Sequence, residues 1–472
     1  MAMHVYVGGA CPWLDGHIKS FIRRHVPDAV FVSDPKAIPK DASTVYQFCD
    51  GWELNENFAV LNAAANGLIN AYPSSDALAR KDYMARVIEC WTAKRPDSIL
   101  KTNSPATVRL SLDYAEYVDD ALAAADDLTI LYSLEDNLNK EPSDREWWIL
   151  KPALVDCGAG IRIFSTEEEL ASNLELAEDE DDDEDTDSVT ERSEPATDLE
   201  DGINPKDFLP TLSTPGLTAL DALVTATSSL VIDPRPKKKQ QYVFKADGRI
   251  PSAQMREFVA QRYIVSIPPL EKRKWHARAY VLSVGRLKVY VFRDMLALLA
   301  GEDYAPPWLN PSLRASLTNT GLQEDEDILS KESMRSLWAA PDDLLPGDWK
   351  NELFRQVCEV SAELFRGAVH TMADKFTTMN KCFELFALDF LVDTNGTAWL
   401  LEVNETPAFY EQGVAGSIAL NLMESVIAVT LQHMGLANGV GGMSKTSKAR
   451  MVQVLDETKS LAKSNITEIL PE

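Results

Sequence analysis

The chain has 472 residues, of which 45% are hydrophobic and 8% are aromatic, and its formal net charge is −27. This length and composition indicate a globular protein of two or three domains with sizeable cores. An isoelectric point near 4.7 argues against a protein that binds nucleic acid over its whole surface.

The six cysteines are scattered without a Cys-x-x-Cys pair, which argues against a disulfide framework and a zinc site. The N-terminus has no basic region followed by an apolar core, and no apolar run approaches the length of a membrane span. We therefore expect a cytoplasmic protein that has neither a membrane nor a nucleic acid as partner. We also expect it to be a monomer.

The first part of the chain is typical of a small α/β unit. Short strands are predicted at 4–9, 29–32 and 44–48, with an amphipathic stretch around His17–His25. A turn and capping cluster at Tyr72–Asp76 precedes the helical segment ALARKDYMARVIECW.

The next ordered stretch begins with an apolar strand at 147–151, WWILK, followed by Pro152 and the glycine-bearing CGAGIRIF. Ser165 or Thr166 is expected to cap a helix that opens with Glu167–Glu169.

Residues 171–240 have the composition of an insertion that is largely disordered. They contain eight consecutive acids, Glu178–Asp185, and polar segments interrupted by proline. Such a segment cannot bury enough apolar area to offset its ordering entropy, although Gly216–Ile232 could dock as a helix. By contrast, residues 235–293 hold fifteen Lys or Arg and three acids, which suggests a locally bound anionic ligand.

A strand pair is predicted at 276–292, with Gly285 in its turn, followed by helical segments and a hairpin at 385–409. A glycine-rich joint separates a last helix around 449–462. This order of elements indicates an α+β, or mixed α/β, enzyme. We divide the chain into four parts. Residues 1–75 form an N-terminal α/β domain, and residues 76–263 form a central domain that includes the insertion. Residues 264–436 form a C-terminal domain, and residues 437–472 form a flexible linker with a tail helix.

The hairpin places acidic groups where folding alone would not require them. With Asn395-Gly396 as a two-residue turn, Asp389 lies opposite Glu402, and Asn404 emerges on the same face as Glu402. Directly opposed carboxylates repel each other, so a positive partner is expected over them. Two carboxylates and an amide suit Mg²⁺. The alternative is that the acids point into solvent or pair with a lysine, and a guanidinium on these oxygens would exclude the ion.

Several separated pieces together resemble the tubulin–tyrosine ligase-like family of ATP-grasp enzymes. These are the segment around Lys81, WWILKP with GAGI, QRYI with KWHAR, LDFLVD with WLLEVNETP, and the weaker match at 318–320. The resemblance runs from about Tyr72 to Phe409, interrupted by the insertion. It implies an ATP-grasp fold in which an ATP cleft lies between the central and C-terminal domains.

The resemblance also implies a role for each matching residue. Lys151 and Lys81 would contact the nucleotide phosphates, with Gly158 and Gly160 in a loop that closes over them. The adenine would be lined by Gln261, Arg262, Tyr263 and Ile264. Lys274 and Arg278, four apart on one strand face, would hold the acceptor carboxylate or the γ-phosphate. Mg²⁺ would be bound by Asp389, Glu402 and Asn404, and Lys274, Arg278 and Glu402 would be the catalytic groups. The alternatives are surface lysines, an ordinary glycine turn and a plain core strand.

Two positions depart from the family pattern. His276 stands where an Asp is usual, and Leu298 stands where a second Arg often occurs. Both belong to the side of the acceptor or the amino acid, so the resemblance supports nucleotide binding better than it identifies either ligated partner.

The resemblance implies a ligase that uses ATP and Mg²⁺ to add a free amino acid to the acidic C-terminal tail of a protein, tubulin in the family, through an acyl phosphate. The first alternative is a pseudo-ligase that binds ATP without ligating and acts as a protein scaffold. The second is an ATP-grasp ligase for a small-molecule carboxylate.

Overall fold

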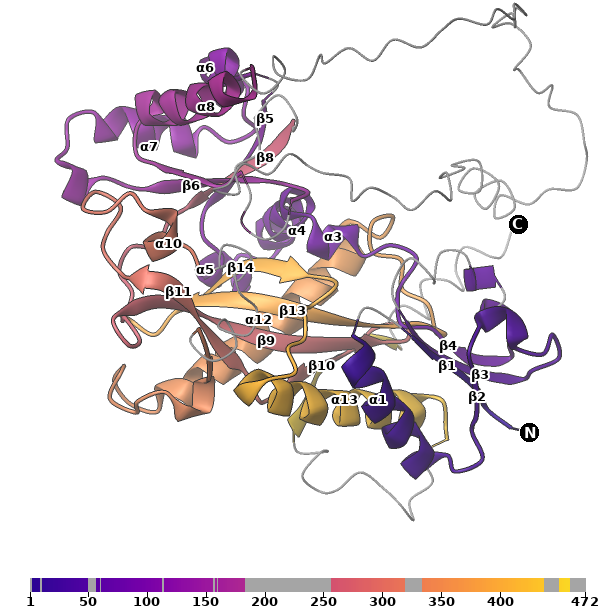
Figure 1. Ribbon diagram of the computed structural model, residues 1–472. Helices are drawn as coiled ribbons and strands as arrows, with labels where there is room; N and C mark the ends of the chain where they lie inside the picture. Colours follow the sequence, from indigo (N-terminus) through magenta and orange to yellow (C-terminus); the bar gives the residue numbers. More distant parts are fainter. Residues whose placement is uncertain are drawn as a thin grey trace, which may run out of the picture.

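The computed structural model describes residues 2–8, 11–49, 57–59, 61–112, 114–155, 158, 160–182, 256–318, 333–436 and 450–458. The predicted helix at Gly216–Ile232, the rest of the insertion after Asp182, and residues Asn319 and Thr320 lie outside the described residues. The described part forms three sheets, each with its own helices, which are arranged side by side in Figure 1.

The N-terminal sheet is parallel, with strand order β2-β1-β3-β4. Its strands are β1 His4–Gly8, β2 Val30–Val32, β3 Thr44–Cys49 and β4 Asn66–Leu68. The three predicted strands are present, whereas β4 was not predicted because Asn-Gly-Leu has little strand propensity. Helix α1, Pro12–His25, is amphipathic and buries Leu14, Ile18 and Ile22. A 3₁₀ turn, η1 Pro35–Ala37, precedes β3.

The central sheet is antiparallel, with strand order β5-β8-β6-β7. Its strands are β5 Thr107–Ser111, β6 Trp148–Pro152, β7 Arg162–Phe164 and β8 Glu257–Arg262. Helices α6 Val118–Ala123, α7 Thr129–Asn137 and α8 Glu167–Asp182 lie together beside this sheet (Figure 1). The predicted cap of α8 is confirmed: Thr166 Oγ1 accepts from Glu169 N at 3.2 Å, and Glu169 Oε2 accepts from Ser165 N at 2.7 Å. The remaining short elements here are η2 Ala115–Tyr117 and η3 Pro142–Asp144.

The C-terminal sheet has seven strands, and all of its pairings are antiparallel. The strands are β9 Arg273–Val284, β10 Lys288–Phe292, β11 Leu296–Asp303, β12 Met334–Ser336, β13 Phe383–Val392, β14 Ala398–Asn404 and β15 Met451–Asp456. The predicted pair at 276–292 is β9 with β10, and Gly285 turns between them at φ 65°. The predicted helical segment before the hairpin is α12, Trp349–Thr371, with the short α10 Leu313–Ser316 and η6 Leu337–Ala339 earlier in the chain.

Helices cover both faces of this sheet. On one face, Trp275, Ala277 and Ala279 of β9 belong to the core that α12 completes. On the other face, Tyr280 and Leu282 belong to the core formed with α13, Gly413–His433, and α1. Because side chains alternate along a strand, Lys274, His276 and Arg278 lie on this second face, beyond the end of its apolar core.

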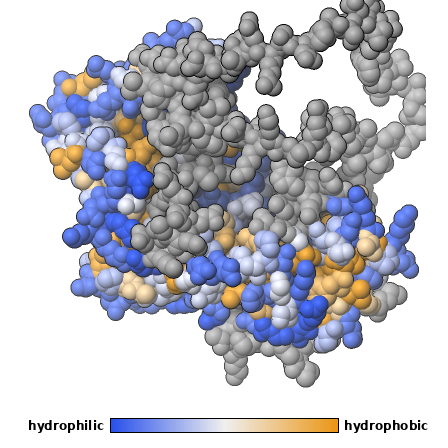
Figure 2. All heavy atoms as spheres, viewed as in Figure 1, coloured by the Kyte–Doolittle hydropathy of each residue, from blue (hydrophilic) through white to orange (hydrophobic). Residues whose placement is uncertain are grey.

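Helix α13 corrects one expectation from the sequence. By length and composition it is apolar enough to cross a membrane, although no such run was predicted. Its Leu422, Val426 and Ile427 are buried in the core shared with α1, which is the arrangement of a core helix in a globular domain. On the described part of the face seen in Figure 2, hydrophilic and hydrophobic side chains are interspersed.

The described segment at 450–458 corrects a second expectation from the sequence. The tail was predicted as a helix around 449–462, but residues 451–456 form β15, paired with β10. Met451 and Leu455 are buried, so this segment completes the sheet rather than hanging loosely from it. The exposed edge of β10 supplies hydrogen-bonding partners that no local sequence pattern reveals. Residues after 458 lie outside the described residues.

The helices that follow the N-terminal domain pack against a different domain from the one predicted for them. Helices α3 Asp76–Ala79, α4 Lys81–Lys94 and α5 Leu100–Asn103 were assigned to the central domain. Trp91 of α4 stacks on His370 of α12 and donates to Glu363 Oε2 at 2.6 Å. This segment therefore shares its core with the C-terminal sheet.

The hairpin β13–β14 reaches its predicted register by an unpredicted route. Asp389 does lie opposite Glu402. The loop, however, has three residues rather than two: Asp393 pairs with Thr397, Gly396 has φ 80°, and Asp393 Oδ1 accepts from two loop amides. An extra residue in β14, Leu401, forms a bulge between Phe390 and Asp389 that restores the register.

Candidate functional site

The candidate site is a small cavity of about 60 Å³ where the ends of β6 and β8 face β9, β13 and β14. Its walls combine apolar and charged side chains. The lining residues used below are Lys151, Gln261, Arg262, Tyr263, Ile264, Lys274, His276, Ser316, Thr318, Asp389, Leu401 and Glu402. Ligand pockets typically enclose several hundred Å³, so a nucleotide would require this cavity to widen.

Lys151 ends β6 inside the protein, where it is 6% exposed. Its Nζ donates to Gln261 Oε1 on β8 at 2.9 Å, which is a neutral acceptor. Burial, offset in part by the charge of Glu402, lowers the pKa of Lys151 from 10.5 to about 8. A buried cation without a carboxylate in hydrogen-bonding contact is suited to an incoming anion.

Lys274 is a second buried cation and is held by an aromatic ring. Its Nζ lies 3.7 Å from the centroid of the Tyr263 ring, and burial together with the charge of Lys151 holds its pKa well below the ordinary value. Nearby, Ser316 Oγ is buried and has no hydrogen-bond partner. The cavity therefore offers cationic and hydroxyl donors that the protein itself does not fully use.

The predicted adenine segment runs along one wall. All four of its residues, Gln261, Arg262, Tyr263 and Ile264, line the cavity. Arg262 points outward to an ion pair with Glu146. The backbone N–H of Tyr263 already donates to Trp147 O at 2.8 Å. The ring of Tyr263 is thus the largest aromatic surface of this segment that lines the cavity.

The predicted metal residues come together as a group. Asp389 and Glu402 are cross-strand partners, and Asn404 Nδ2 lies 3.2 Å from Asp389 Oδ2. Lys81 Nζ lies 3.8 Å from Glu402 Oε2 and donates to Val155 O at 2.8 Å. Lys81 therefore bridges the acidic hairpin and the chain that leads into the glycine loop.

The expected positive partner of Asp389 is a side chain of the protein itself. Arg278 Nε donates to Oδ1 at 2.9 Å, and Arg278 Nη2 donates to Oδ2 at 2.8 Å. Burial alone would raise the pKa of Asp389, but the adjacent charge of Arg278, followed by His276, holds it well below its usual range. Arg278 was expected to hold a substrate anion, whereas in this conformation it occupies both oxygens of Asp389.

A divalent cation fits these residues by donor chemistry, because Asp389 and Glu402 are opposed carboxylates and Asn404 adds an amide beside Asp389. The guanidinium of Arg278 occupies both Asp389 oxygens, which is the arrangement expected to exclude the ion from this conformation. Within the described residues, no group of three His, Cys, Asp or Glu side chains that could hold an ion is found. The magnesium assignment therefore stays a prediction that requires Arg278 to leave Asp389.

The two departures from the family pattern occupy neighbouring positions. His276 and Leu298 are cross-strand partners on β9 and β11. His276 Nδ1 lies 2.5 Å from Thr318 Oγ1, and its Nε2 lies 3.4 Å from Asp389 Oδ1. Leu298 is 1% exposed in the apolar core, so it presents no polar group to the cavity.

Gly158 and Gly160 lie in the loop after β6, with φ values of 80° and 70°. Only glycine adopts these values readily, which fits both the predicted phosphate loop and the alternative of an ordinary glycine turn. Their neighbours Asp156, Cys157 and Ala159 lie outside the described residues. Lining residues to which the sequence assigned no role include Ile161, which ends the quoted GAGI segment, Ser316, which lies just before the weak match at 318–320, and Leu401, which the bulge adds to β14.

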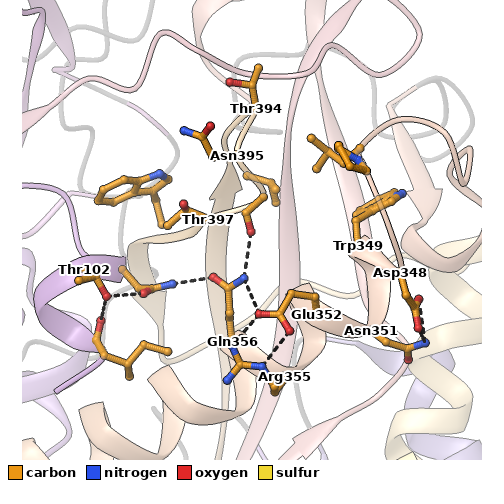
Figure 3. A pocket seen from close by; sticks show the side chains of 17 residues that line it. Thr102, Asp348, Trp349, Asn351, Glu352, Arg355, Gln356, Thr394, Asn395 and Thr397 are labelled. Carbon is orange, nitrogen blue, oxygen red and sulfur yellow. Dashed lines mark hydrogen bonds and ion pairs between the residues drawn. The ribbon is translucent and has the colours of Figure 1, made fainter. Parts of the chain in front are cut away.

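A larger cavity of about 1210 Å³ lies at the turn end of the same hairpin (Figure 3). Its central side chain, Gln356, is satisfied by the protein: it donates to Gly396 O at 2.9 Å and accepts from Asn103 Nδ2 at 2.7 Å. Arg355 and Glu352 pair with each other at 2.6 Å. The side chains of Gln356, Arg355 and Glu352 therefore already have partners within the protein.

Comparisons with known proteins show the family of the chain and its fold. The model of the tubulin-tyrosine ligase family matches residues 60–438. A protein of Schizosaccharomyces pombe described as a "Probable tubulin--tyrosine ligase" is 34% identical over 363 residues, which cover 76% of each chain. The "Probable tubulin--tyrosine ligase PBY1" of Saccharomyces cerevisiae is 30% identical over 74% of this chain, which spans 40% of that longer protein.

A solved structure shares the fold. It is the crystal structure of the C-terminal domain of K. lactis Pby1, described as an ATP-grasp enzyme that interacts with the mRNA decapping enzyme Dcp2. The TM-score is 0.61 at 23% identity, and the match covers 97% of this chain and 99% of that one. The expected ATP-grasp fold, a mixed α/β architecture, is confirmed.

Proposed function

Because the chain belongs to the tubulin–tyrosine ligase family, we propose that it is an ATP-dependent ligase that joins a free amino acid to the acidic C-terminal tail of a protein. The observation that carries the proposal is that Lys151, Lys274 and Asp389, whose carboxylate is paired with Arg278, line one cavity between two sheets. Lys81 and Arg278 lie against the carboxylates of Glu402 and Asp389, and Lys151 and Lys274 line the cavity beside them. This excess of positive charge favours a polyanionic ligand.

In the proposed nucleotide site, different residues contact the adenine and the phosphates. The adenine would lie along Gln261–Ile264, against the Tyr263 ring, while Lys151 and Lys81 would balance the phosphate charge. Gly158 and Gly160 would allow the backbone to approach the phosphates closely. Bound Mg²⁺, held by Asp389, Glu402 and Asn404, would polarise the phosphate oxygens.

The chemistry is phosphoryl transfer followed by acyl transfer. A carboxylate oxygen of the acceptor attacks the γ-phosphorus, ADP leaves, and an acyl phosphate forms. The amino group of the donor then attacks the acyl carbon, phosphate leaves, and an amide bond remains. Lys274 and Arg278 would orient the carboxylate and stabilise the developing charge, so no protein nucleophile is needed.

An acidic acceptor suits the charge of the described strand region. Between Arg256 and Arg293 the described residues hold nine Lys or Arg and two acids, Glu257 and Glu271. A tubulin-like tail rich in glutamate would be attracted to this region. We also propose that the protein acts as a monomer in the cytoplasm, where such acceptors occur.

The second candidate is an ATP-binding scaffold that no longer ligates. It is favoured by His276 and Leu298, which stand at the acceptor side of the site in place of the Asp and Arg that the family resemblance leads us to expect. The K. lactis relative is described as interacting with a decapping enzyme, and a protein partner of that kind would suit a scaffold.

One assay separates these candidates. The purified full chain is incubated with ATP, Mg²⁺, radiolabelled amino acids and carboxy-terminal peptides, with Lys151→Met as the site variant and Lys140→Met as a surface control. Label that enters the peptides with the wild type and the control, but not with Lys151→Met, supports the ligase. Nucleotide binding with no label in any combination supports the scaffold. Incorporation into small metabolites alone would assign a small-molecule ligase.

A further inference from the structure

The Arg278–Asp389 pair sits where two different ligands of the proposed reaction would bind. The guanidinium is a fork that matches a carboxylate, and Asp389 is one of the oxygen donors for a divalent cation. The two residues are cross-strand partners on β9 and β13, so their backbones fix the contact. Asp389 is 2% exposed and also lies 3.2 Å from Asn404 Nδ2. Its oxygens are therefore covered by N–H donors, which leaves little room for a cation.

Glu402 is held less tightly. The cation beside it, Lys81, lies 3.8 Å from Oε2, which is beyond hydrogen-bonding distance. Glu402 can therefore contribute to a cation site without losing a strong contact, whereas Asp389 can do so only if Arg278 leaves. Of the two carboxylates, Glu402 is therefore ready to bind a cation, whereas Asp389 is not until the guanidinium of Arg278 leaves it.

Neither residue can separate from the other alone. Moving Arg278 away would leave the buried Asp389 carboxylate with His276 and Asn404 but without its guanidinium partner, and a divalent cation arriving at Asp389 would displace a buried guanidinium. Either event by itself is costly because it strands a buried charge. Both become favourable together when an external carboxylate takes Arg278 while the cation takes Asp389.

We propose that Arg278 is a latch that couples the two binding events: the acceptor carboxylate draws Arg278 from Asp389 and thereby completes the divalent-cation site. This inference rests on the proposed function, because it assigns the acceptor's carboxylate to Arg278. Coupling of this kind is reciprocal, so the cation also tightens binding of the acceptor. The latch keeps the metal site incomplete, and phosphoryl transfer to water unsupported, until an acceptor is present.

The test measures Mn²⁺ binding to the full chain by electron paramagnetic resonance, with and without a hexaglutamate peptide. For the wild type, the peptide is expected to tighten Mn²⁺ binding by at least about tenfold, after subtraction of binding to the peptide alone. Arg278→Gln is expected to bind Mn²⁺ tightly without the peptide and to gain nothing from it. Amidated hexaglutamine, which carries no carboxylate, should have no effect.

Arg335→Gln is the matched control. Arg335 makes the same two-pronged contact with Glu271, at 2.8 Å and 2.8 Å, but on the surface. This variant should respond to the peptide as the wild type does. Arg278→Lys, which keeps the charge but not the fork, should fall between the wild type and Arg278→Gln, and it provides a second variant if Arg278→Gln does not fold.

Two results would overturn the latch. One is folded Arg278 variants that, without peptide, bind Mn²⁺ no more tightly than the wild type. The other is tightening by inorganic phosphate but not by the peptide. Binding of a fluorescent ATP analogue in EDTA is measured in parallel. Its absence, with Mn²⁺ coupling intact, would contradict the proposed function and leave the latch standing.

Discussion

Lys151 on β6 donates its hydrogen bond to Gln261 on β8, and the acceptor is an amide rather than a carboxylate. The cation thus lies buried beside a neutral partner, which explains why burial lowers its pKa to about 8. A nucleotide phosphate in the cavity would be the first strong anion in contact with it.

This relationship predicts a pH dependence of nucleotide affinity. In the free protein Lys151 loses its proton above about pH 8, whereas a bound phosphate would retain it. Affinity for a fluorescent ATP analogue should therefore fall above pH 8, by up to about tenfold per pH unit. Stability of the free protein changes in the opposite sense: between pH 8 and 10.5 the unfolded state binds more protons, so this lysine's contribution to stability rises with pH.

The matched variants for that measurement are Lys151→Met and Lys140→Met. Lys151→Met should weaken binding at pH 7 by about 1.5–3 kcal/mol and should abolish the pH dependence that Lys151 causes. Lys140→Met should behave as the wild type. An affinity that stays level from pH 7 to pH 9.5 in the wild type would remove Lys151 from the phosphate site.

We predict that substitution of Glu384 on β13 stabilises the protein, and that the gain depends on pH. Burial raises its pKa from 4.5 to about 8, despite hydrogen bonds from Tyr72 N at 3.1 Å and Ser75 Oγ at 2.9 Å. Between pH 4.5 and 8 the folded state binds more protons than the unfolded state, so stability falls as pH rises through this window. Glu384→Gln should raise stability at pH 8 by about 2–4 kcal/mol and change it little at pH 4.5. Thermal unfolding at the two pH values checks this, and an equal effect at both would contradict it.

Replacing His276 by aspartate, the residue that is usual at this position in the family, should destabilise the free protein. His276→Asp places a second carboxylate beside Asp389, where the imidazole Nε2 now lies 3.4 Å away. We expect a loss of at least about 2 kcal/mol in denaturant unfolding, because like charges meet in a buried site. His276→Asn, which adds no charge, should lose less. If His276→Asp also incorporates tyrosine into peptides, this position selects the amino donor; a variant as stable as the wild type would contradict the assigned contact.

The last strand should matter to the whole C-terminal sheet. Leu455 of β15 is 3% exposed and belongs to the core under α12. Leu455→Ala should lower the free energy of unfolding by about 2–3 kcal/mol, whereas Gln453→Ala on the exposed side should change it by less than about 0.5 kcal/mol. Chemical unfolding measures both. Equal, negligible effects would restore the view that this segment is a loose tail.

Several features of the site were predictable because their signals are local. The apolar run in WWILK predicts a buried strand that ends in Lys151, and the apolar runs around Asn395-Gly396 predict a hairpin with Asp389 opposite Glu402. The details of that hairpin were not predictable in the same way. The three-residue loop and the bulge at Leu401 compensate each other, so the predicted register was correct although the predicted turn was wrong.

The amino-acid sequence by itself determined which residues carry charge into the cleft and on which strand face each one lies, because periodicity and turn chemistry act over a few residues. Only the tertiary structure decided which charged side chains pair with each other. Arg278 and Asp389 are 111 residues apart, and they meet because β9 and β13 are neighbours in the sheet. A buried carboxylate takes the nearest cation that the fold supplies, and that choice depends on distances no linear pattern contains. For the same reason β15 is a strand, since the edge of β10 provides the partners that its own residues lack.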